Sequence, residues 1–540
     1  MRHPFSFSLP LCALFFGAPA HAVDWHVSPT GTATCGCTTK AAPCSLASAA
    51  SGAVAGDTVY LASGSYQQSL VVANSGTEAA PITFKAEDCA TPIIERLVST
   101  DADQTAGVYS EKGEYLVFEG LVVRGWSVGF GNRWVGGRDT SDVSNGHWTI
   151  NHCIAYSNGR TGFTFFSAPS FRLTNSISAH NGSSLLHSWS SGVTLYEATG
   201  TNLIQGVVSF ENTDEQKHTD GSGFVVDEES DHATFINNIA FGNSGSCLRL
   251  TKSSGTTFIN NTCYHNSQFG SEATGPTDPG ELYFTNGDVT IQNVNFANNV
   301  IVGTGVAPAG STPIKSQPTA GWSHNLVSTG AASFFTAPEG TNPDFTLATN
   351  ATTLIGQGVT DTSTPTADIG FDPKCLVKRA PTMFGSVVAL ARWQYDVDLD
   401  YVASHGGVAK CFNAGARSAP ADIGAYKNGP VTMVTAACVP SADGGAGGSS
   451  PCSGTSGGGS GAGGGSGAGG SGGVTQPTST AGSAGSAGAA PVVPPQMSAA
   501  SGDTGCGCRV ASGRISALPA ALASLGLAAA ALRRRRHEEA

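Results

Sequence analysis

The chain has 540 residues, of which 71 are glycine and only 12% are charged, and its formal net charge is −12 at neutral pH. Nucleic-acid binding depends on basic surface, so this acidic balance excludes nucleic acid as an expected partner. The composition is uneven along the chain, which predicts several segments with different roles.

The first 22 residues are typical of a secretory signal. Arg2 precedes an apolar run over residues 9–16, and Ala20 and Ala22 stand at the small-residue spacing of a cleavage site. The sequence therefore predicts cleavage after Ala22 and export into an oxidising compartment, where disulfides form.

A short element recurs between residues 147 and 305. It consists of a small residue, an aromatic or small residue, any residue, and asparagine. Its asparagines, spaced by 23, 31, 31 and 23 residues, are Asn158, Asn181, Asn212, Asn243 and Asn266. A repeat of this length predicts a stack of similar structural units.

Each repeat contains short runs with alternating apolar residues. One run precedes the element, as in residues 235–239. A second run follows it, at residues 163–166, 193–196, 224–226, 248–250 and 282–284. An apolar period of two predicts strands rather than helices. Two or three strands per coil, with Asn and Gly at the corners, predict a parallel β-helix whose buried asparagines hydrogen-bond in a ladder.

Segments on both sides of the repeats resemble a known family. Residues 25–31, 55–61 and 80–86 look like the first coils of the pectate-lyase-like right-handed β-helix superfamily, and residues 344–347 and 421–426 resemble its closing segment. The expected fold is therefore all-β, a right-handed parallel β-helix over residues 23–430. One fold hosts many functions, so the resemblance is specific for fold and weak for chemistry.

Two neighbouring coils carry eight extra residues after the corner asparagine. These insertions, residues 182–191 and 213–222, are expected on one side of the stack, where insertions commonly form a binding face. A tryptophan beside charged groups suits a sugar ring. The candidate side chains are His187 and Trp189 for substrate binding, and Lys217, His218 and Asp220 for catalysis.

Alignment of successive strands predicts their register. Residues 221–224 align with 245–248, which sets Val225 beside Arg249 in a column with Tyr283. Arg249 would then point outward beside the insertions, where it could neutralise a substrate carboxylate, and Tyr283 would contribute to substrate binding.

An acidic run over residues 227–231 has two interpretations. It is either a solvated turn or part of a calcium site, since clustered carboxylates supply the oxygen ligands that calcium needs. The predicted ligand set is Asp220, Asp227 and Glu228, and calcium is the one cofactor that we expect.

The resemblance also implies a chemistry. Several members of the superfamily are polysaccharide lyases that use a Lys or Arg base together with calcium. Residues 219–224 look like the Asp-Gly-Phe element of calcium-dependent pectate lyases, but Asn-Ser-Gly-Ser at residues 243–246 replaces that family's aspartates. A glycosidase would need two carboxylates, which Glu197, Asp220 and Asp227 could supply, but the family pattern for it is absent.

Two functional hypotheses follow. The first is a lyase that cleaves an acidic polysaccharide with Lys217, His218, Asp220 and Arg249. The second is a surface protein that binds glycan or a neighbouring cell without catalysis. The recurring corner histidines His152, His180 and His265 are interpreted as structural.

The cysteines indicate disulfides. Eleven of them lie in the body and the stalk, an odd number that leaves at least one unpaired within the chain. The pairs favoured by spacing are Cys375 with Cys411, Cys438 with Cys452, and Cys44 with Cys35 or Cys37.

The C-terminal part reads as a stalk and an anchor. Residues 431–504 form a low-complexity linker, and an apolar stretch over residues 515–532 is long enough to span a bilayer, with arginines at 533–536 on the cytoplasmic side. Together with Cys506 and Cys508 this tail resembles the MYXO-CTERM sorting signal. The resemblance implies processing by a sortase-like membrane protease and display at the cell surface.

Overall fold

The structure is a computed structural model, and it describes the greater part of the chain before residue 428. The described residues are 22–32, 37–96, 105–110, 112–132, 145–167, 169–186, 188–269, 280–285, 290–303, 314–315, 321–330, 332–360, 365–379, 390, 392–417 and 421–427. The predicted signal, linker, membrane span and sorting cysteines lie outside them. Within these ranges no helix has both the length and the apolar character needed to cross a bilayer.

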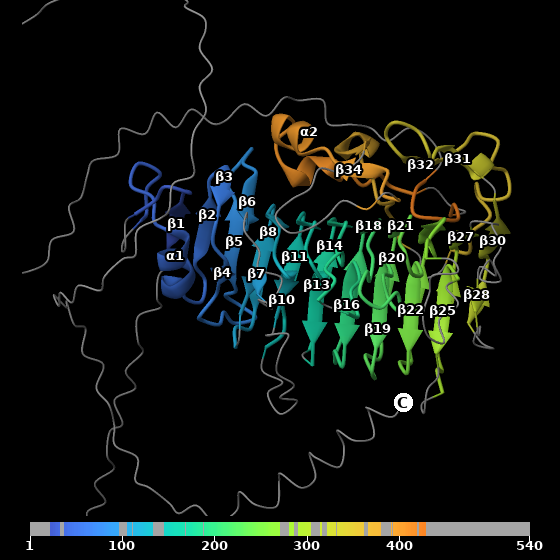
Figure 1. Ribbon diagram of the computed structural model, residues 1–540, viewed down its shortest axis with the longest axis horizontal. Helices are drawn as coiled ribbons and strands as arrows, with labels where there is room; N and C mark the ends of the chain where they lie inside the picture. Colours follow the sequence, from blue (N-terminus) through green and yellow to red (C-terminus); the bar gives the residue numbers. More distant parts are fainter. Residues whose placement is uncertain are drawn as a thin grey trace, which may run out of the picture. The chain divides into compact units, whose positions relative to one another are not determined.

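Most of the described chain folds into three parallel sheets that run side by side along one stack (Figure 1). Strands from the three sheets alternate along the chain, so that every coil except those at the two ends contributes one strand to each sheet. This arrangement of stacked parallel strands confirms the parallel β-helix that the repeats predicted, and it fits the right-handed form that the family resemblance implied.

Sheet A begins with the first strand of the body. Each of its strands pairs in parallel with the equivalent strand of the next coil. Its strands are β1 (Asp24–Val27), β2 (Thr58–Leu61), β5 (Ile82–Ala86), β8 (Leu116–Glu119), β11 (Thr149–Asn151), β14 (Arg172–Thr174), β17 (Leu203–Gln205), β20 (Thr234–Ile236), β23 (Thr257–Ile259), β26 (Asn295–Ala297) and β29 (Trp322–Ser323).

Sheet B follows sheet A across a sharp turn in each coil. Its strands are β3 (Gly64–Tyr66), β6 (Pro92–Glu95), β9 (Val122–Arg124), β12 (Ile154–Tyr156), β15 (Ile177–Ala179), β18 (Val208–Phe210), β21 (Ile239–Phe241), β24 (Thr262–Tyr264), β27 (Val300–Gly303) and β30 (Leu326–Thr329). The predicted run over residues 235–239 is therefore two strands, since the chain turns at Asn237, whose φ is +55°.

Sheet C completes each coil and carries the predicted second runs. Its strands are β4 (Leu70–Val71), β7 (Ala106–Tyr109), β10 (Val128–Gly131), β13 (Thr161–Phe166), β16 (Val193–Tyr196), β19 (Phe224–Asp227), β22 (Leu248–Thr251), β25 (Leu282–Thr285) and β28 (Ile314–Lys315). The predicted register is confirmed, because Val225 pairs with Arg249 and Arg249 pairs with Tyr283.

The corner asparagines between sheets B and C form the predicted ladder. The side-chain amide of Asn181 donates to the side-chain oxygen of Asn212 at 2.9 Å, and Asn212 donates to Asn243 at 2.9 Å. The backbone N–H groups of Asn181 and Asn212 donate to these same side-chain oxygens of Asn212 and Asn243, respectively. Because these side chains are fully buried, the ladder satisfies polar groups that water cannot reach.

A glutamate accepts from the last asparagine of this ladder. The backbone and side-chain N–H groups of Asn266 donate to the two carboxyl oxygens of Glu281 at 2.8 and 2.7 Å. Burial raises the pKa of Glu281 to about 8, although the two hydrogen bonds from Asn266 favour the charged form.

Replacing Glu281 by glutamine is expected to remove a loss of stability at higher pH. The folded pKa lies above the unfolded one, so the folded state resists ionisation of Glu281 and its stability falls as the pH rises from about 4.5 to about 8. In Glu281→Gln that fall should shrink by at least about 1.4 kcal/mol, the equivalent of one pKa unit. Chemical unfolding across this pH range measures it. Parallel profiles for wild type and variant would contradict the assignment, and the exposed Glu78→Gln is the control.

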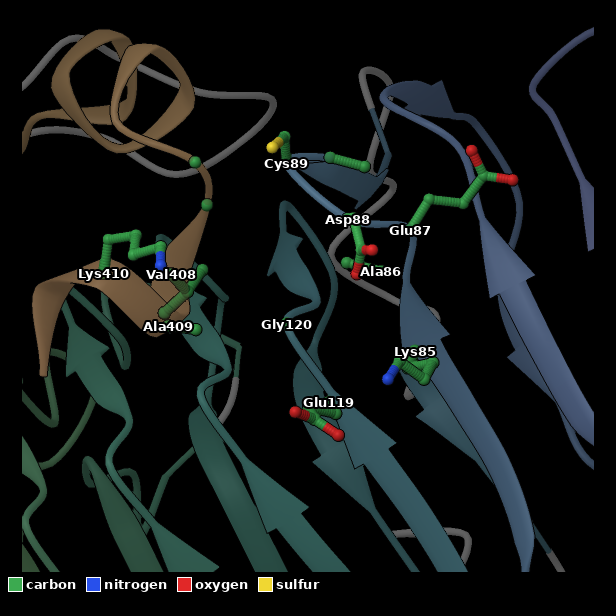
Figure 2. Close-up of a pocket in the computed structure, with 13 residues that line it drawn as sticks. Lys85, Ala86, Glu87, Asp88, Cys89, Glu119, Gly120, Val408, Ala409 and Lys410 are labelled. Atoms are coloured by element: carbon green, nitrogen blue, oxygen red, sulfur yellow. The ribbon is translucent and has the colours of Figure 1, made fainter. Parts of the chain in front are cut away.

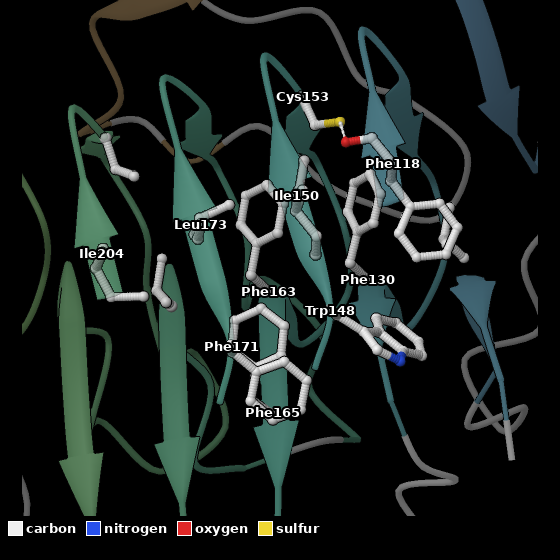
Figure 3. Close-up of a cluster of buried hydrophobic side chains, with 14 of the residues drawn as sticks. Phe118, Phe130, Trp148, Ile150, Cys153, Phe163, Phe165, Phe171, Leu173 and Ile204 are labelled. Atoms are coloured by element: carbon white, nitrogen blue, oxygen red, sulfur yellow. Dashed lines mark hydrogen bonds between the residues drawn. The ribbon is translucent and has the colours of Figure 1, made fainter. Parts of the chain in front are cut away.

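Aromatic side chains fill the interior of the stack (Figure 3). Phe130 stacks on Phe163 with ring centroids 5.0 Å apart, and Phe165 stacks on Phe171 at 4.3 Å. Cys153 lies in the same interior as a free thiol, and its sulfur donates to the carbonyl of Phe118. The interior around these residues is therefore a packed aromatic core.

Sheet B is apolar on its outer face as well, and a C-terminal segment covers that face. We call this segment the C-terminal cover, and its described residues are 332–360, 365–379, 392–417 and 421–427. Phe241 contacts Phe345 and Tyr395 with ring centroids 5.0 and 5.7 Å apart. The segments that resemble a closing region thus pack sideways against sheet B, where they bury its outer apolar residues.

The C-terminal cover has little regular structure (Figure 1). Its elements are η2 (Ala332–Phe334), β31 (Phe335–Ala337), β32 (Asp344–Leu347), η3 (Pro373–Cys375), β33 (Leu376–Lys378), β34 (Tyr395–Val397), α2 (Leu399–Ser404) and η4 (Val408–Cys411). The strands β31 and β32 pair antiparallel, as do β33 and β34. Neither α2 nor the N-terminal helix α1 (Leu46–Gly52), which is capped by Ser45, was predicted.

Disulfides agree with the predictions in part. Cys375 and Cys411 are bonded as predicted, and Cys44 pairs with Cys37 rather than Cys35. A further bond joins Cys247 to Cys263 and was not predicted, because their proximity arises only from coil stacking. The predicted pair Cys438 and Cys452 lies outside the described residues.

Candidate functional site

The two insertions stack directly on each other. The backbone N–H of Glu215 donates to the carbonyl of Gly182 at 3.1 Å, and the N–H of Gly221 donates to the carbonyl of Ser190 at 2.7 Å. Gly182 has a φ of +92°, and a Cβ there would lie 1.7 Å from the carbonyl oxygen of Thr213. The first insertion can approach the second this closely only with glycine at that position.

An exposed cation lies on an exposed aromatic ring where the insertions meet. The Lys217 ammonium is 3.9 Å from the ring centroid of Trp189, a cation–π contact between the second insertion and the first. The Trp189 side chain is 57% exposed. Two residues that sequence analysis assigned separately to binding and catalysis therefore form one surface feature.

A buried ion pair lies where the second insertion rejoins sheet C. The carboxylate of Asp220 contacts the guanidinium of Arg249, and their side chains are only 6% and 16% exposed. The Arg249 guanidinium also lies 6.0 Å from the ring centroid of Tyr283, which is 5% exposed. Arg249 points away from the core as predicted, but its side chain is mostly buried, and the Tyr283 ring packs beside its guanidinium.

Asp214 holds the end of the second insertion in place. Its carboxylate accepts hydrogen bonds from the Thr219 hydroxyl at 2.8 Å and from the backbone N–H of Asp220 at 3.3 Å. Burial raises the pKa of Asp214 and lowers that of nearby Arg160 to about 10. Asp214 therefore orients the backbone that presents Asp220 to Arg249.

His218 is supported by residues that sequence analysis did not identify. Its imidazole stacks on Phe269 with ring centroids 4.5 Å apart, and the Arg392 guanidinium lies 5.4 Å from the same Phe269 ring. Arg392 also donates to the Thr213 hydroxyl at 2.7 Å and pairs with the Glu215 carboxylate. Phe269 lies three residues after the corner asparagine Asn266, just as Glu215 lies three residues after Asn212. Alignment of the repeats could therefore have identified Phe269 as a neighbour of the insertion.

Replacing Arg392 by alanine is expected to loosen the second insertion. The change removes charge-assisted hydrogen bonds to Thr213 and Glu215, worth about 1.5 to 3 kcal/mol each. Amide hydrogen exchange over residues 213–220 should then accelerate by about tenfold or more. The control is Arg379→Ala, which removes an ion pair with Asp396 within the C-terminal cover. Equal exchange in both variants would show that Arg392 does not hold the insertion.

The predicted calcium ligands do not converge. Among the residues that the structure describes, no three His, Cys, Asp or Glu side chains are grouped so that they could hold a metal ion. Asp220 is paired with Arg249, and Glu228 is paired with Lys252 at 3.2 Å. Burial and the neighbouring Glu228 raise the pKa of Asp227 to about 6. Asp220, Asp227 and Glu228 therefore do not form a set of ligands that fits calcium, and calcium is given no role in the reaction proposed below.

The corner histidines meet the C-terminal cover. His180 is paired with Glu211 at 3.1 Å and stacks on Trp393 with ring centroids 4.6 Å apart. His152 contacts Phe412, and His265 lies 3.5 Å from the carboxylate of Glu339. These contacts agree with the structural role predicted for them. His187 lies outside the described residues.

A separate pocket of about 400 Å3 lies at the turns after β5 and β8, against η4 (Figure 2). Its charged lining residues are Lys85, Glu87, Asp88, Glu119 and Lys410. Glu87 already pairs with His26 at 3.1 Å. The pocket shares no lining residue with the two insertions, so it is distinct from the candidate site.

Comparisons with known proteins returned structural similarities only. No family model and no curated protein matches the chain. The pectate lyase Pel9A is similar with 17% identity and a TM-score of 0.44 over 69% of this chain and 97% of its own. A rhamnogalacturonan lyase has 14% identity and a TM-score of 0.37, covering 61% and 97%.

A further solved structure is the A-module of the Azotobacter vinelandii mannuronan C-5 epimerase AlgE4. It has 18% identity and a TM-score of 0.29 over 51% of this chain and 87% of its own. At these identities and scores the similarities assign neither an activity nor residue roles, which must be argued from the geometry of the site.

Proposed function

We propose that the chain acts on an acidic polysaccharide at the surface made by its two insertions. The observation that carries this proposal is the contact of Lys217 with Trp189 between the two insertions, the second of which also holds Asp220 against Arg249. An exposed indole suits the apolar face of a sugar ring, and the adjacent ammonium suits a carboxylate on that sugar. The chain as a whole has a negative net charge, so the positive charge of Lys217 stands out on an otherwise acidic protein.

The activity that we propose is β-elimination at a uronate residue. A base removes the C5 proton, the electron pair forms the C4–C5 double bond, and the C4–oxygen bond breaks as the leaving oxygen takes up a proton. His218 is assigned as the base, since it follows Lys217 on the second insertion, is partly exposed, and has its ring held by Phe269. Lys217 is assigned to the substrate carboxylate, where positive charge stabilises the carbanion-like transition state.

The test is turnover by the purified full chain on a panel of polyuronates, with and without calcium. Ultraviolet absorbance of the unsaturated product should rise, and His218→Ala should lower the rate by about 100-fold or more. The exposed Lys112→Ala is a control that should leave the rate unchanged. If no polyuronate yields an unsaturated product under either condition, the lyase assignment is wrong.

Binding without turnover is the second candidate, and one observation favours it. Asp220 neutralises Arg249, so the most buried cation of the site is already paired before any substrate is present. A glycan-binding protein would retain an immobilised polyuronate through Trp189 and still retain it in Lys217→Ala and His218→Ala, while releasing no product.

We further propose that the chain is exported and displayed at the cell surface. This rests on the signal-like residues 1–22 and on the sorting-like tail with Cys506 and Cys508. Surface labelling of intact cells should modify the protein. Deleting residues 505–540 should release it into the medium, and retention of the truncated chain would contradict the anchor.

A further inference from the structure

The first insertion exposes an unusual amount of apolar surface. Among the described residues, six large hydrophobic side chains are exposed, and three of them fall within this one loop. Leu185, Leu186 and Trp189 are 68%, 56% and 57% exposed. Scattered exposed hydrophobics are ordinary, but a group of this kind on one loop marks a contact surface.

The loop is held in the conformation that exposes them. The backbone N–H of Ser184 donates to the carbonyl of Gly159 at 3.0 Å, and the N–H of Leu186 donates to the Ser184 hydroxyl at 3.1 Å. Ser190 is fully buried at the other end of the loop. The leucines are therefore presented by an anchored backbone and cannot easily turn inward.

The size of this apolar patch and the charge beside it indicate what kind of ligand it would bind. Lys217 lies on Trp189, one of these three side chains, so a cation adjoins the exposed apolar side chains of this loop. Three side chains cover far less than the roughly 800 Å2 that each partner of a stable protein complex buries. A membrane surface calls for a broad apolar face with many basic residues, whereas this chain has a net charge of −12. The patch fits small apolar groups carried on an anionic polymer.

We propose that Leu185, Leu186 and Trp189 form an apolar subsite for O-acyl substituents on an acidic polysaccharide. This rests on the proposed function and narrows its substrate class from uronate polymers in general to acylated ones. The acyl methyl groups lie on the leucines, while the sugar carboxylate lies near Lys217. The subsite contributes to selection of the polymer and takes no part in bond cleavage.

The test compares two forms of one polymer. The full-length protein is titrated with an O-acetylated polyuronate and with the same polymer after mild alkaline de-esterification. Burying one methyl-sized group changes affinity about fourfold, so we expect the acetylated form to bind about fourfold more tightly for each acetyl group that the subsite holds. The double variant Leu185→Ser and Leu186→Ser should lose this preference and bind the de-esterified form as wild type does. Val327→Ser removes an exposed hydrophobic elsewhere and should behave as wild type.

The other outcomes separate the two proposals. If both polymers bind equally well and the double variant matches wild type, the acyl subsite is wrong and glycan binding stands. If neither polymer binds, both proposals fail. Co-sedimentation with phosphatidylcholine vesicles, or self-association, that the double variant abolishes would assign the patch to a membrane or to a second copy and would also overturn the acyl subsite.

Discussion

Asn212→Ala is expected to lower the free energy of unfolding by about 3 to 5 kcal/mol. The Asn212 side chain accepts from the backbone and side-chain N–H groups of Asn181 and donates to Asn243, all in the buried interior. Alanine leaves the backbone N–H of Asn181 without its acceptor, removes one acceptor of the Asn181 side-chain amide, and takes away the donor to the Ser178 carbonyl. Each buried unsatisfied group costs about 1 to 3 kcal/mol. Denaturant unfolding monitored by circular dichroism measures the change.

The matched control for Asn212 is Asn350→Ala at an exposed turn of the C-terminal cover. Its free energy of unfolding should stay within about 0.5 kcal/mol of wild type. If Asn212→Ala loses less than about 1 kcal/mol, water or a shift of the coils replaces the missing partner. The ladder would then not be a main source of stability in this stack.

The second large effect is expected at the buried ion pair. Asp220→Ala leaves the mostly buried Arg249 guanidinium without its carboxylate and should cost about 3 to 5 kcal/mol of stability. Replacing both residues, with Asp220→Ala and Arg249→Met together, should restore most of that loss, because no buried charge is then unpaired. Unfolding free energies of the two single variants and the double variant form a double-mutant cycle that isolates the pair.

A more exposed ion pair is the control for this cycle. Glu228 and Lys252 are 29% and 21% exposed at their side chains, so Glu228→Gln should cost no more than about 1 kcal/mol. Additive losses for Asp220 and Arg249 would contradict the pairing. Turnover on a polyuronate should fall in all three variants of the cycle, since the end of the second insertion depends on this contact.

Local pattern was enough to predict the repeating part of the fold. The five predicted second runs each lie within two residues of the start of a strand of sheet C, because an apolar period of two is readable within a few residues. The column of Val225, Arg249 and Tyr283 was also predictable, since stacked coils of known spacing leave one register that keeps apolar residues inside. The asparagine ladder follows from the same spacing.

The site was predicted only as a region. Spacing located the two insertions and named Trp189, Lys217 and Asp220 within them. It could not show that Lys217 lies on Trp189 or that Asp220 faces Arg249, because side-chain directions in inserted loops have no period. The expected calcium set failed to converge for the same reason, as Asp220 and Glu228 each meet a cation instead.

The coils, their register and the side of the stack that carries the two insertions can be read from the amino-acid sequence, because β-strand alternation and the coil repeat act over short distances along the chain. The packing of the C-terminal cover on sheet B, and the contacts of Arg392 with Thr213 and Glu215, are seen only in the folded protein. Those contacts join residues far apart in the chain. They depend on complementary shape and on charges that become neighbours after folding, and no repeat in the sequence encodes them.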